Sequence, residues 1–406
     1  MADRVPVWVT GAAVMAGGAP DLAAFDAMLR ATRPGIGQPI GEAPWESWVN
    51  EITARDPETG RRARRVARMA STPLRTSLRV AVDAMRSAGS GAGTPSESVG
   101  VVVAGSNLAQ DRAFLAAEKM LAEPAFLSPR HGYEFYDTHV MGVIAEALDL
   151  RGPGLTVGGA SASGNVAVGV ALDLIRCGRA DACLVVGPMP ALSPVERQAL
   201  TAMGALAAPG QLCRPFDRAA RGFVPGEACG AIVLERSDRA AARGAVPLAE
   251  VAGACWVQGA NHQPAPDLDS EMRAMTGAMR DAGIGVGDLD LVSAHATSTP
   301  AGDVLECEAL RRVLGDRRSD IAINAPKSLF GHGLHAAGIV ETIAIILQMR
   351  GGYVHGTAHL ENPIADDLGL LGPSTIQRPV RHALNNGFGF ASIAASVVLR
   401  GLEDRG

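Results

Sequence analysis

The chain has 406 residues, of which 47% are hydrophobic and 19% charged, a composition that favours a globular protein over a disordered one. A formal net charge of −5 gives no basis for binding nucleic acid. Charged residues interrupt the apolar runs well before the roughly 20 residues that a membrane-spanning helix needs. Six cysteines without a C-x-x-C spacing favour free thiols in a reducing compartment, so we expect a cytoplasmic protein, and the N-terminal sequence shows no signal-peptide pattern.

The predicted elements alternate between β-branched runs and alanine-rich amphipathic segments. In chain order, strands are predicted at residues 5–11, 99–105, 154–158, 182–187 and 229–235, with helices at 73–87, 139–149 and 165–177. After a joint rich in arginine and alanine, strands follow at 248–253, 289–295, 320–325, 383–390 and 395–401, with helices at 270–283, 303–313 and 335–349. Strands separated by helices imply helix-covered sheets. The series of alternating strands and helices thus starts again near residue 246, which predicts two similar α/β halves, residues 1–245 and 246–406, packed as one unit.

The segment TGRRARRVARMASTPLR, residues 59–75, is locally basic. Its arginines can simply form the solvated face of a helix. They can also form a docking patch for an acidic partner such as a carrier protein, and the residues of that patch would be Arg61, Arg62, Arg64 and Arg65. The sequence leaves both interpretations open.

The stretch TVGGASASGN, residues 156–165, is predicted to join a strand to a helix. Val166 and Val170 continue at helical spacing, so Ser161 lies just before a helix N-terminus. Unpaired N–H groups and positive partial charge at that place suit a developing anion. Ser161 and Ser163 can also be capping and turn residues only. The G-x-S-x-G motif of serine hydrolases is incomplete, because Ser163 occupies its last position.

Five motifs, in this order along the chain, resemble those of the β-ketoacyl synthases of the thiolase superfamily. They are GPGLTVGGASASGN (152–165), RPFDRAARGFVPGE (214–227), SAHATSTPAGDVLE (293–306), APKSLFGHGLHAAGIVE (325–341) and NNGFGFASIA (385–394). Any one of these motifs would be a weak signal, whereas five in the family's order are specific. The resemblance implies a thiolase-like, five-layered αβαβα fold built of two similar halves, and a homodimer.

The resemblance also implies the roles of individual residues. Ser161 takes the position of the family's nucleophilic cysteine, and His295 and His332 are the paired catalytic histidines. Lys327 and Glu341 correspond to the family's supporting ionic residues, which we expect to hold His332 and its surroundings.

The same motifs imply how the substrate is bound. Thr297 and Thr299 would line the tunnel for the pantetheine arm, and Phe390 would be the gating aromatic residue near the oxyanion site. No separate cofactor is expected, because the phosphopantetheine of an acyl carrier protein holds the substrate. His332 and His335 have an i, i+3 spacing, but no third ligand follows at a suitable distance in the sequence, so we expect no metal site.

Serine at position 161 predicts decarboxylation without condensation. A cysteine thiol, with a pKa of about 8.5, becomes a thiolate readily, whereas a serine hydroxyl needs a hydrogen-bonded base. Loss of CO2 from a malonyl thioester needs only donors to the enolate oxygen, which His295 and His332 can supply. With no acyl-enzyme to attack, the enolate takes a proton and becomes an acetyl thioester. Ser161 would then mark a lost nucleophile.

A narrower resemblance supports this interpretation. GASASGN and the segment 133–152 (YEFYDTHVMGVIAEALDLRG) resemble the ketosynthase-like decarboxylases, with serine in place of cysteine, that act in polyketide β-branching. This resemblance implies malonyl-acyl carrier protein as the substrate and an HMG-CoA-synthase-like enzyme as the downstream partner. Residues 391–394, ASIA, depart from the family's G-G-x-N, and the bulkier Ala391 and Ser392 are expected to stiffen or narrow the acyl side of the site.

Two other functions stay open on the sequence. An acyltransferase, hydrolase or condensing enzyme would use Ser161 as a true nucleophile. A non-catalytic subunit, similar to a chain-length factor, would only pair with an active synthase. Such subunits commonly lack the catalytic histidines, and both histidines are present in this chain.

Overall fold

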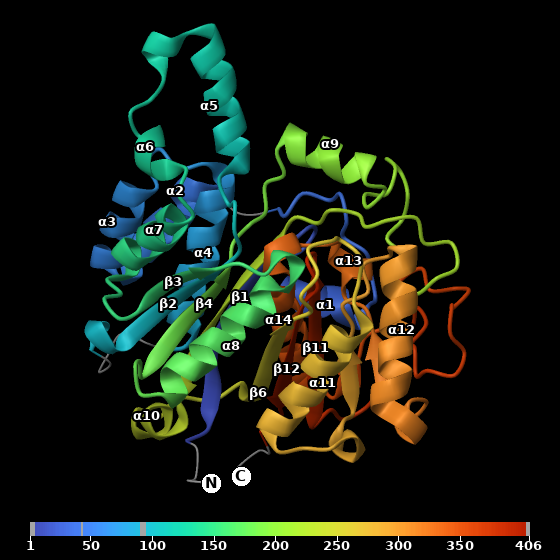
Figure 1. Cartoon of the computed structure of the whole chain (residues 1–406). Helices are drawn as coiled ribbons and strands as arrows, with labels where there is room; N and C mark the ends of the chain where they lie inside the picture. Colours follow the sequence, from blue (N-terminus) through green and yellow to red (C-terminus); the bar gives the residue numbers. More distant parts are fainter. Residues whose placement is uncertain (1–4, 42–43, 90–94, 403–406) are drawn as a thin grey trace.

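The computed structural model describes residues 5–41, 44–89 and 95–402 (Figure 1). Ten strands form one sheet in the order β3-β2-β4-β5-β1-β6-β12-β11-β7-β8. The first five are β1 (Val7–Ala16), β2 (Val99–Ala104), β3 (Gly154–Val157), β4 (Ala182–Gly187) and β5 (Ala228–Arg236). The others are β6 (Ala249–Gln258), β7 (Leu291–Ser293), β8 (Ala322–Asn324), β11 (His382–Gly389) and β12 (Ile393–Arg400). All ten overlap the predicted strands.

The two halves of the sheet have the same topology. In the first half, β3, β2 and β4 are parallel, and β5 and then β1 follow antiparallel. In the second half, β8, β7 and β11 are parallel, and β12 and then β6 follow antiparallel. The halves join through β1 and β6, which pair antiparallel at Trp8 with Glu250 and at Val9 with Ala249. The predicted pair of similar halves is therefore confirmed, and the division at residues 245 and 246 stays a prediction.

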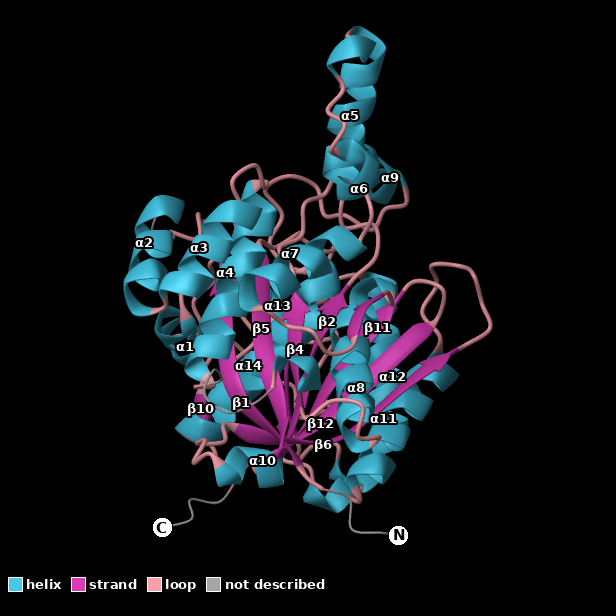
Figure 2. Cartoon of the chain, turned by 90° about the vertical axis from the view of Figure 1, so that its left-hand side faces the viewer, coloured by secondary structure: helices cyan, strands magenta, loops and turns pink. Residues whose placement is uncertain are grey.

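The two halves of the sheet form two of the five layers, and helices form the other three. α4 (Thr72–Ser87) and α7 (Thr138–Leu148) cover the outer face of the first half, and α11 (Leu268–Ala282) packs on the outer face of the second half beside α12 (Pro300–Leu314). α8 (Ser163–Arg176) and α14 (Ala337–Gly351) lie together in the middle and contact strands of both halves (Figures 1 and 2). Both central helices are buried on most sides, as expected for helices without a polar face. The structure is the predicted five-layered thiolase-like fold.

The remaining elements are shorter or lie outside the layers. They are α1 (Leu22–Arg30), α2 (Trp45–Arg55), α3 (Pro57–Val66), α5 (Gln110–Ala122), α6 (His131–Glu134), α9 (Pro194–Ala202), α10 (Ser237–Ala242) and α13 (Lys327–Phe330). The strands β9 (Tyr353–Val354) and β10 (Ile376–Gln377) form a separate pair. Among the described residues, no helix combines the length and the apolar character needed to cross a membrane.

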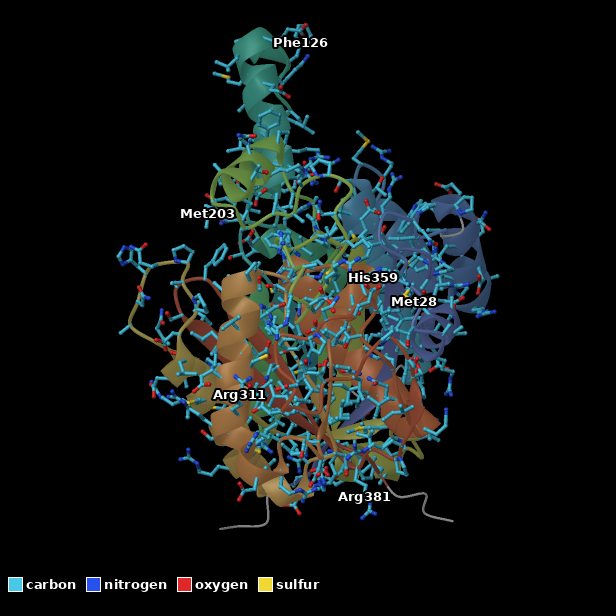
Figure 3. The ribbon with its side chains drawn as sticks, turned by 90° about the vertical axis from the view of Figure 1, so that its right-hand side faces the viewer. Met28, Phe126, Met203, Arg311, His359 and Arg381 are labelled. Atoms are coloured by element: carbon cyan, nitrogen blue, oxygen red, sulfur yellow. The ribbon has the colours of Figure 1, made fainter. Side chains whose placement is uncertain are left out.

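One helical arm projects from the layered body. It contains α5 and the turns down to α6, and no residue of α5 is buried (Figures 1 and 2). Its exposed apolar side chains are Leu115, Met120, Leu121, Phe126, Tyr133, Phe135 and Tyr136. Leu121 is 87% exposed and Phe126 74% exposed, and Figure 3 shows Phe126 at the tip of the arm. Exposed apolar patches are typical of interaction sites on protein surfaces.

Candidate active site

Residues from all five sequence motifs line one cavity of about 570 Å³. The predicted site residues that line it are Ser161, His295, His332, Thr297, Thr299 and Phe390. The hydroxyl oxygens of Thr297 and Thr299 are 2.8 Å apart, and Phe390 is partly exposed at the end of the β11 segment. The fold therefore brings these residues together, although they are up to 229 positions apart in the chain.

A tight turn places Ser161 at the cavity. Ser161 lies in a 3₁₀ turn, Ala160–Ala162, between β3 and α8. The Ser163 hydroxyl accepts a hydrogen bond from the Gly159 N–H at 2.9 Å and donates one to the Ala160 carbonyl at 2.6 Å. Ser163 is fully buried, so it is a turn residue. Ser161 thus lies directly before α8, as the helical spacing predicts, with its hydroxyl facing the cavity.

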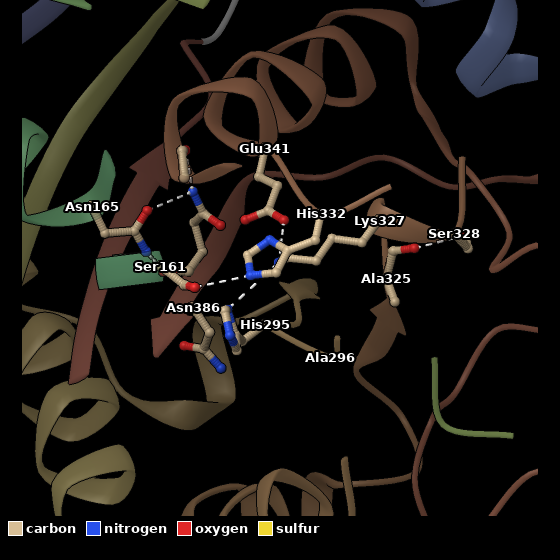
Figure 4. Close-up of polar contacts among 12 residues, drawn as sticks. Ser161, Asn165, His295, Ala296, Ala325, Lys327, Ser328, His332, Glu341 and Asn386 are labelled. Atoms are coloured by element: carbon tan, nitrogen blue, oxygen red, sulfur yellow. Dashed lines mark hydrogen bonds and ion pairs between the residues drawn. The ribbon is translucent and has the colours of Figure 1, made fainter. Parts of the chain in front are cut away.

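The imidazole ring of His332 directs its Nε2 atom at the Ser161 hydroxyl. Its Nε2 lies 2.9 Å from the Ser161 hydroxyl oxygen (Figure 4). Its Nδ1 accepts a hydrogen bond from the Leu334 backbone N–H at 3.3 Å. A neutral imidazole with an accepting Nδ1 carries its proton on Nε2. His332 therefore donates to the serine oxygen and is not arranged to remove the serine proton.

His295 is held by a different set of contacts. The backbone N–H groups of His295 and Ala296 both donate to the carboxylate of Glu306, at 2.8 and 2.7 Å. The Lys327 ammonium nitrogen lies 3.5 Å from His295 Nδ1, at the outer limit of a hydrogen bond. An ammonium group has no acceptor, so Nδ1 accepts in this contact and Nε2 carries the proton of the ring.

The contact of Lys327 adds a detail to the sequence interpretation. We expected Lys327 and Glu341 to hold His332 and its surroundings, and the histidine that Lys327 contacts is His295, whose ring centroid lies 5.7 Å from that of His332. Lys327 begins the short helix α13, whereas His332 follows the end of that helix. The helix separates the two residues and turns the lysine into the interior, where its side chain is fully buried.

Both histidines are neutral near pH 7. Burial lowers the pKa of His295 well below its usual value, and the nearby Lys327 ammonium lowers it further. Burial also lowers the pKa of His332, with Lys327 again the next cause. The two ring centroids are 5.7 Å apart and the ring planes are nearly perpendicular, at 82°. The cavity is thus served by two neutral rings, each with one N–H donor on Nε2.

A buried ion pair lies behind the histidines. Lys327 and Glu341 form a salt bridge, and both side chains are almost completely removed from solvent (Figure 4). Burial raises the pKa of Glu341 to about 7, and the ammonium of Lys327 opposes this rise. Glu341 lies on the central helix α14, so the ion pair ties the α13 segment to the middle layer.

Asparagine side chains fix the serine turn to the rest of the site. The Asn165 amide, one helical turn after Ser161, donates to the carbonyls of Asn385 and Ala395 at 2.9 and 3.1 Å. The Asn385 amide donates to the Gly338 carbonyl at 2.9 Å. These bonds join α8, the β11–β12 pair and α14 where the motifs meet (Figure 4).

The sequence interpretation missed Glu306. This residue lies on α12 and is buried. Burial raises the pKa of its carboxyl group, and hydrogen bonds from several N–H groups partly oppose this rise. It ends the motif SAHATSTPAGDVLE, so its position inside a recognised motif was the available signal.

The loop after Phe390 has an unusual backbone. Ala391 and Ser392 have φ angles of 63° and 54°, in the left-handed region that favours glycine. The Ala391 N–H donates to the Gln263 carbonyl, and the Ser392 carbonyl accepts from the Gly259 N–H, both at 3.1 Å. Two consecutive strained residues are held in place by neighbouring segments, at the position where the family pattern has glycines.

The arginines of the predicted docking patch lie on α3, away from the cavity. Arg61, Arg64 and Arg65 line a separate surface hollow together with Arg68 and Arg130. Arg64 forms an ion pair with Glu46, and Arg65 with Glu146. Arg62 is mostly buried and is bonded to Glu58 and to the Ala147 carbonyl. Three of the four arginines therefore have acidic partners within the chain.

The side chain of His335 is engaged in a contact with the backbone. Its Nε2 is 3.1 Å from the Pro188 carbonyl, and burial lowers its pKa to about 4. Within the described ranges 5–41, 44–89 and 95–402, no group of three His, Cys, Asp or Glu side chains is arranged to hold a metal ion.

The five layers, the central helices and the serine–histidine–histidine cavity define a protein of the thiolase-like condensing class. Family models agree with this class: residues 4–240 match the "Beta-ketoacyl synthase, N-terminal domain" and residues 248–361 the "Beta-ketoacyl synthase, C-terminal domain". The chain belongs to the β-ketoacyl synthase family.

Individual relatives are similar to this chain in sequence, and solved structures are similar to it in fold. A "Polyketide biosynthesis malonyl-ACP decarboxylase PksF" of Bacillus subtilis is 36% identical over 77% of this chain and 76% of its own length. A "Nodulation protein E" of a Rhizobium species is 38% identical over 64% of each chain. The solved structure "The ishigamide ketosynthase/chain length factor" has a TM-score of 0.85 at 27% identity and covers 98% of this chain and 100% of that chain.

A second solved structure bears on partners. It is a "type II PKS acyl-carrier protein in complex with its ketosynthase bound to the hexaketide". It has a TM-score of 0.81 at 26% identity, with 99% of this chain and 100% of that chain covered.

Proposed function

We propose that this protein decarboxylates malonyl-acyl carrier protein to acetyl-acyl carrier protein. One observation carries the proposal: two neutral histidines present N–H donors to a cavity where a serine occupies the nucleophile position. The 36% identity to a malonyl-ACP decarboxylase supports the choice of substrate.

The geometry fits CO2 loss better than acyl transfer. Breaking the bond to the malonyl carboxylate leaves an electron pair that spreads onto the thioester oxygen, and the Nε2–H groups of His295 and His332 stabilise that oxygen. Acyl transfer would require a base for the Ser161 proton. His332 donates to Ser161 through Nε2 and has its other ring nitrogen occupied by the Leu334 N–H. Ser161 is therefore not activated.

The first prediction concerns Ser161. Ser161→Ala should retain most of the decarboxylase activity, because it removes a hydrogen-bond acceptor and leaves the donor of His332 free for the substrate. Mass spectrometry of malonyl-loaded carrier protein mixed with the parent or the variant would measure the loss of CO2 and the formation of acetyl-carrier. Ser161→Cys is the matched variant, because it restores a thiol that an acyl group can load.

Covalent chemistry at Ser161 would give a different result. An acyl adduct on Ser161, together with complete loss of turnover in a folded Ser161→Ala variant, would replace the decarboxylase proposal by an acyltransferase. A parent protein that leaves malonyl-carrier unchanged would contradict the proposed function directly.

The product suits a further enzyme in polyketide β-branching. We propose that an HMG-CoA-synthase-like enzyme uses the acetyl-carrier as its donor thioester. Adding such an enzyme, with a β-ketoacyl-carrier acceptor, to the reaction should consume the acetyl-carrier. Acetyl-carrier that persists in the presence of both would count against this partner.

The second prediction concerns the carrier protein. We propose that the arginines on α3 steer an acidic carrier toward the site, because five arginines surround one surface hollow. Arg61→Glu combined with Arg65→Glu should raise KM at low salt and leave kcat nearly unchanged, and added salt should reduce the difference. The matched control reverses the exposed Arg179 and Arg239, which lie near α10 and away from α3. An equal KM for the double variant and the parent would exclude this surface.

A second copy of the chain is the proposed cover for the arm. Among the strands of the described part of the chain, β3 pairs only with β2 and lies at the sheet edge, where Leu155 is 40% exposed. An edge strand can pair with its own copy across a two-fold axis, and the apolar arm would then pack on the partner. Sedimentation equilibrium at micromolar concentration should give twice the chain mass, and a monomer mass would contradict the homodimer.

A further inference from the structure

The cavity is also lined by two buried polar side chains, Glu271 and Ser392, that have no role in the loss of CO2. Glu271, on α11, is only 3% exposed, and its Oε2 has no hydrogen-bond partner among the described residues. The Ser392 hydroxyl is also buried, and no residue in the described part of the chain forms a hydrogen bond with it. Both residues line the same cavity as Ser161, His295 and His332. A buried polar group without a partner costs about 1–3 kcal/mol, so two of them facing one cavity indicate a ligand or water there.

Contacts of α11 place Glu271 beside the reaction site. Ala274 follows Glu271 by three positions, so the two residues share a face of the helix. Ala274 packs in one cluster with Phe388, and the Phe388 ring centroid lies 5.5 Å from that of His295. Glu271 therefore faces the cavity from the side of His295.

Glu271 is a neutral acid at pH 7. Burial, together with the nearby carboxyl groups of Glu306 and Asp267, raises its pKa to about 10. Within a cavity otherwise supplied with imidazole donors, Glu271 thus holds a transferable proton.

We propose that Glu271 supplies the proton that converts the enolate into the acetyl thioester. This inference rests on the proposed decarboxylase function. When CO2 leaves, the electron pair of the broken carbon–carbon bond stays on the substrate. That pair forms a new carbon–hydrogen bond as the O–H bond of Glu271 breaks, either directly or through water held near Ser392. The resulting carboxylate takes a proton back from solvent, so each turnover consumes one proton.

The chemistry of the reaction explains why such a group would be kept. A condensing enzyme must leave its enolate unprotonated until the enolate attacks the acyl thioester. A decarboxylase must instead protonate the enolate quickly, before CO2 adds back. An acid that faces the cavity serves the second purpose and would hinder the first.

The third prediction tests Glu271 with a variant of the same shape. Glu271→Gln keeps the size and the polar atoms of the side chain but removes the transferable proton. Formation of acetyl-carrier should fall about 100-fold, the lower end of what a positioned general acid contributes. Asp269→Asn is the matched control, because Asp269 lies on the same helix with its side chain 77% exposed, and its activity should equal that of the parent.

Isotope exchange separates proton transfer from a structural role. The reaction is run in 13C-bicarbonate with carbonic anhydrase, and 13C in the residual malonyl-carrier is compared with the acetyl-carrier formed. In Glu271→Gln the enolate should persist and recapture labelled CO2, so the ratio of exchange to product should rise above that of the parent. A variant with parental product formation, or with exchange and product reduced in parallel, would overturn the role of Glu271.

A second variant shows whether a loss of activity comes from misfolding, and the parent protein shows whether the proposed decarboxylase function is correct. Glu271→Met removes the unpartnered polar group, so its melting temperature should equal or exceed that of the parent while acetyl-carrier formation falls as in Glu271→Gln. A folded Met variant with parental activity would also overturn the proposal. If the parent itself forms no acetyl-carrier and shows no exchange, the decarboxylase function fails and the inference falls with it.

Discussion

Replacing either His295 or His332 by alanine should lower kcat by about 10²–10³, the loss typical of one transition-state donor. Each ring presents its N–H on Nε2, because Nδ1 accepts from Lys327 in one case and from the Leu334 N–H in the other. CO2 loss removes no proton from the substrate, so the donors to the forming enolate oxygen dominate the barrier. The measurement is CO2 release and acetyl-carrier formation from malonyl-carrier protein.

The double variant tests whether both donors act on one oxygen. The combined loss should be smaller than the product of the single losses, because groups that act as a unit are not additive. His131→Ala, on α6 and outside the cavity, is the control and should keep parental activity. Circular dichroism would check the fold of each variant. Near-parental rates in both single histidine variants would exclude this mechanism, whatever the fold.

The sequence predicted the layered core because that core follows hydrophobic periodicity. Buried strands such as β2 and β4 are short continuous runs without charged or polar side chains, and the central α8 and α14 begin within recognised motifs. The arm was not predicted as an element, because α5 buries no residue and so has no core-facing pattern in the chain alone.

The sequence could predict which residues form the site, but it could not predict which side chains contact one another. Motif order identified Ser161, His295 and His332, and the structure brings them to one cavity. The sequence did not predict the contact of Lys327 with His295, because that contact depends on how α13 turns the lysine side chain into the interior of the folded protein. Glu271 lies in DSEMRAM, a polar stretch at a helix start that is typical of a solvated surface. Gln263 and Ser392, from two other segments of the chain, line the same cavity as Glu271, and the fold alone brings these segments together.

The buried ion pair should have the largest effect on stability. Lys327→Met leaves Glu341 buried without its cation and should lower the free energy of unfolding by about 3–5 kcal/mol. Without the ammonium, the pKa of Glu341 rises further above its value in the unfolded chain. Such a raised carboxyl pKa makes folding less favourable as pH increases, because the unfolded carboxyl ionises first. The loss should therefore be greater at pH 8 than at pH 5, as measured by urea unfolding.

A paired substitution distinguishes the structural role of Lys327 from its effect on His295. Lys327→Met with Glu341→Met replaces the ion pair by apolar side chains of similar volume, which should restore most of the lost stability. The kcat should remain below that of the parent, by less than in either histidine variant, because no donor then holds His295 Nδ1 and the ring can place its proton on the wrong nitrogen. Lys327 would then act as a positioning residue through the tautomer of His295. Full recovery of kcat in the stable double variant would show that the lysine contributes only through the fold.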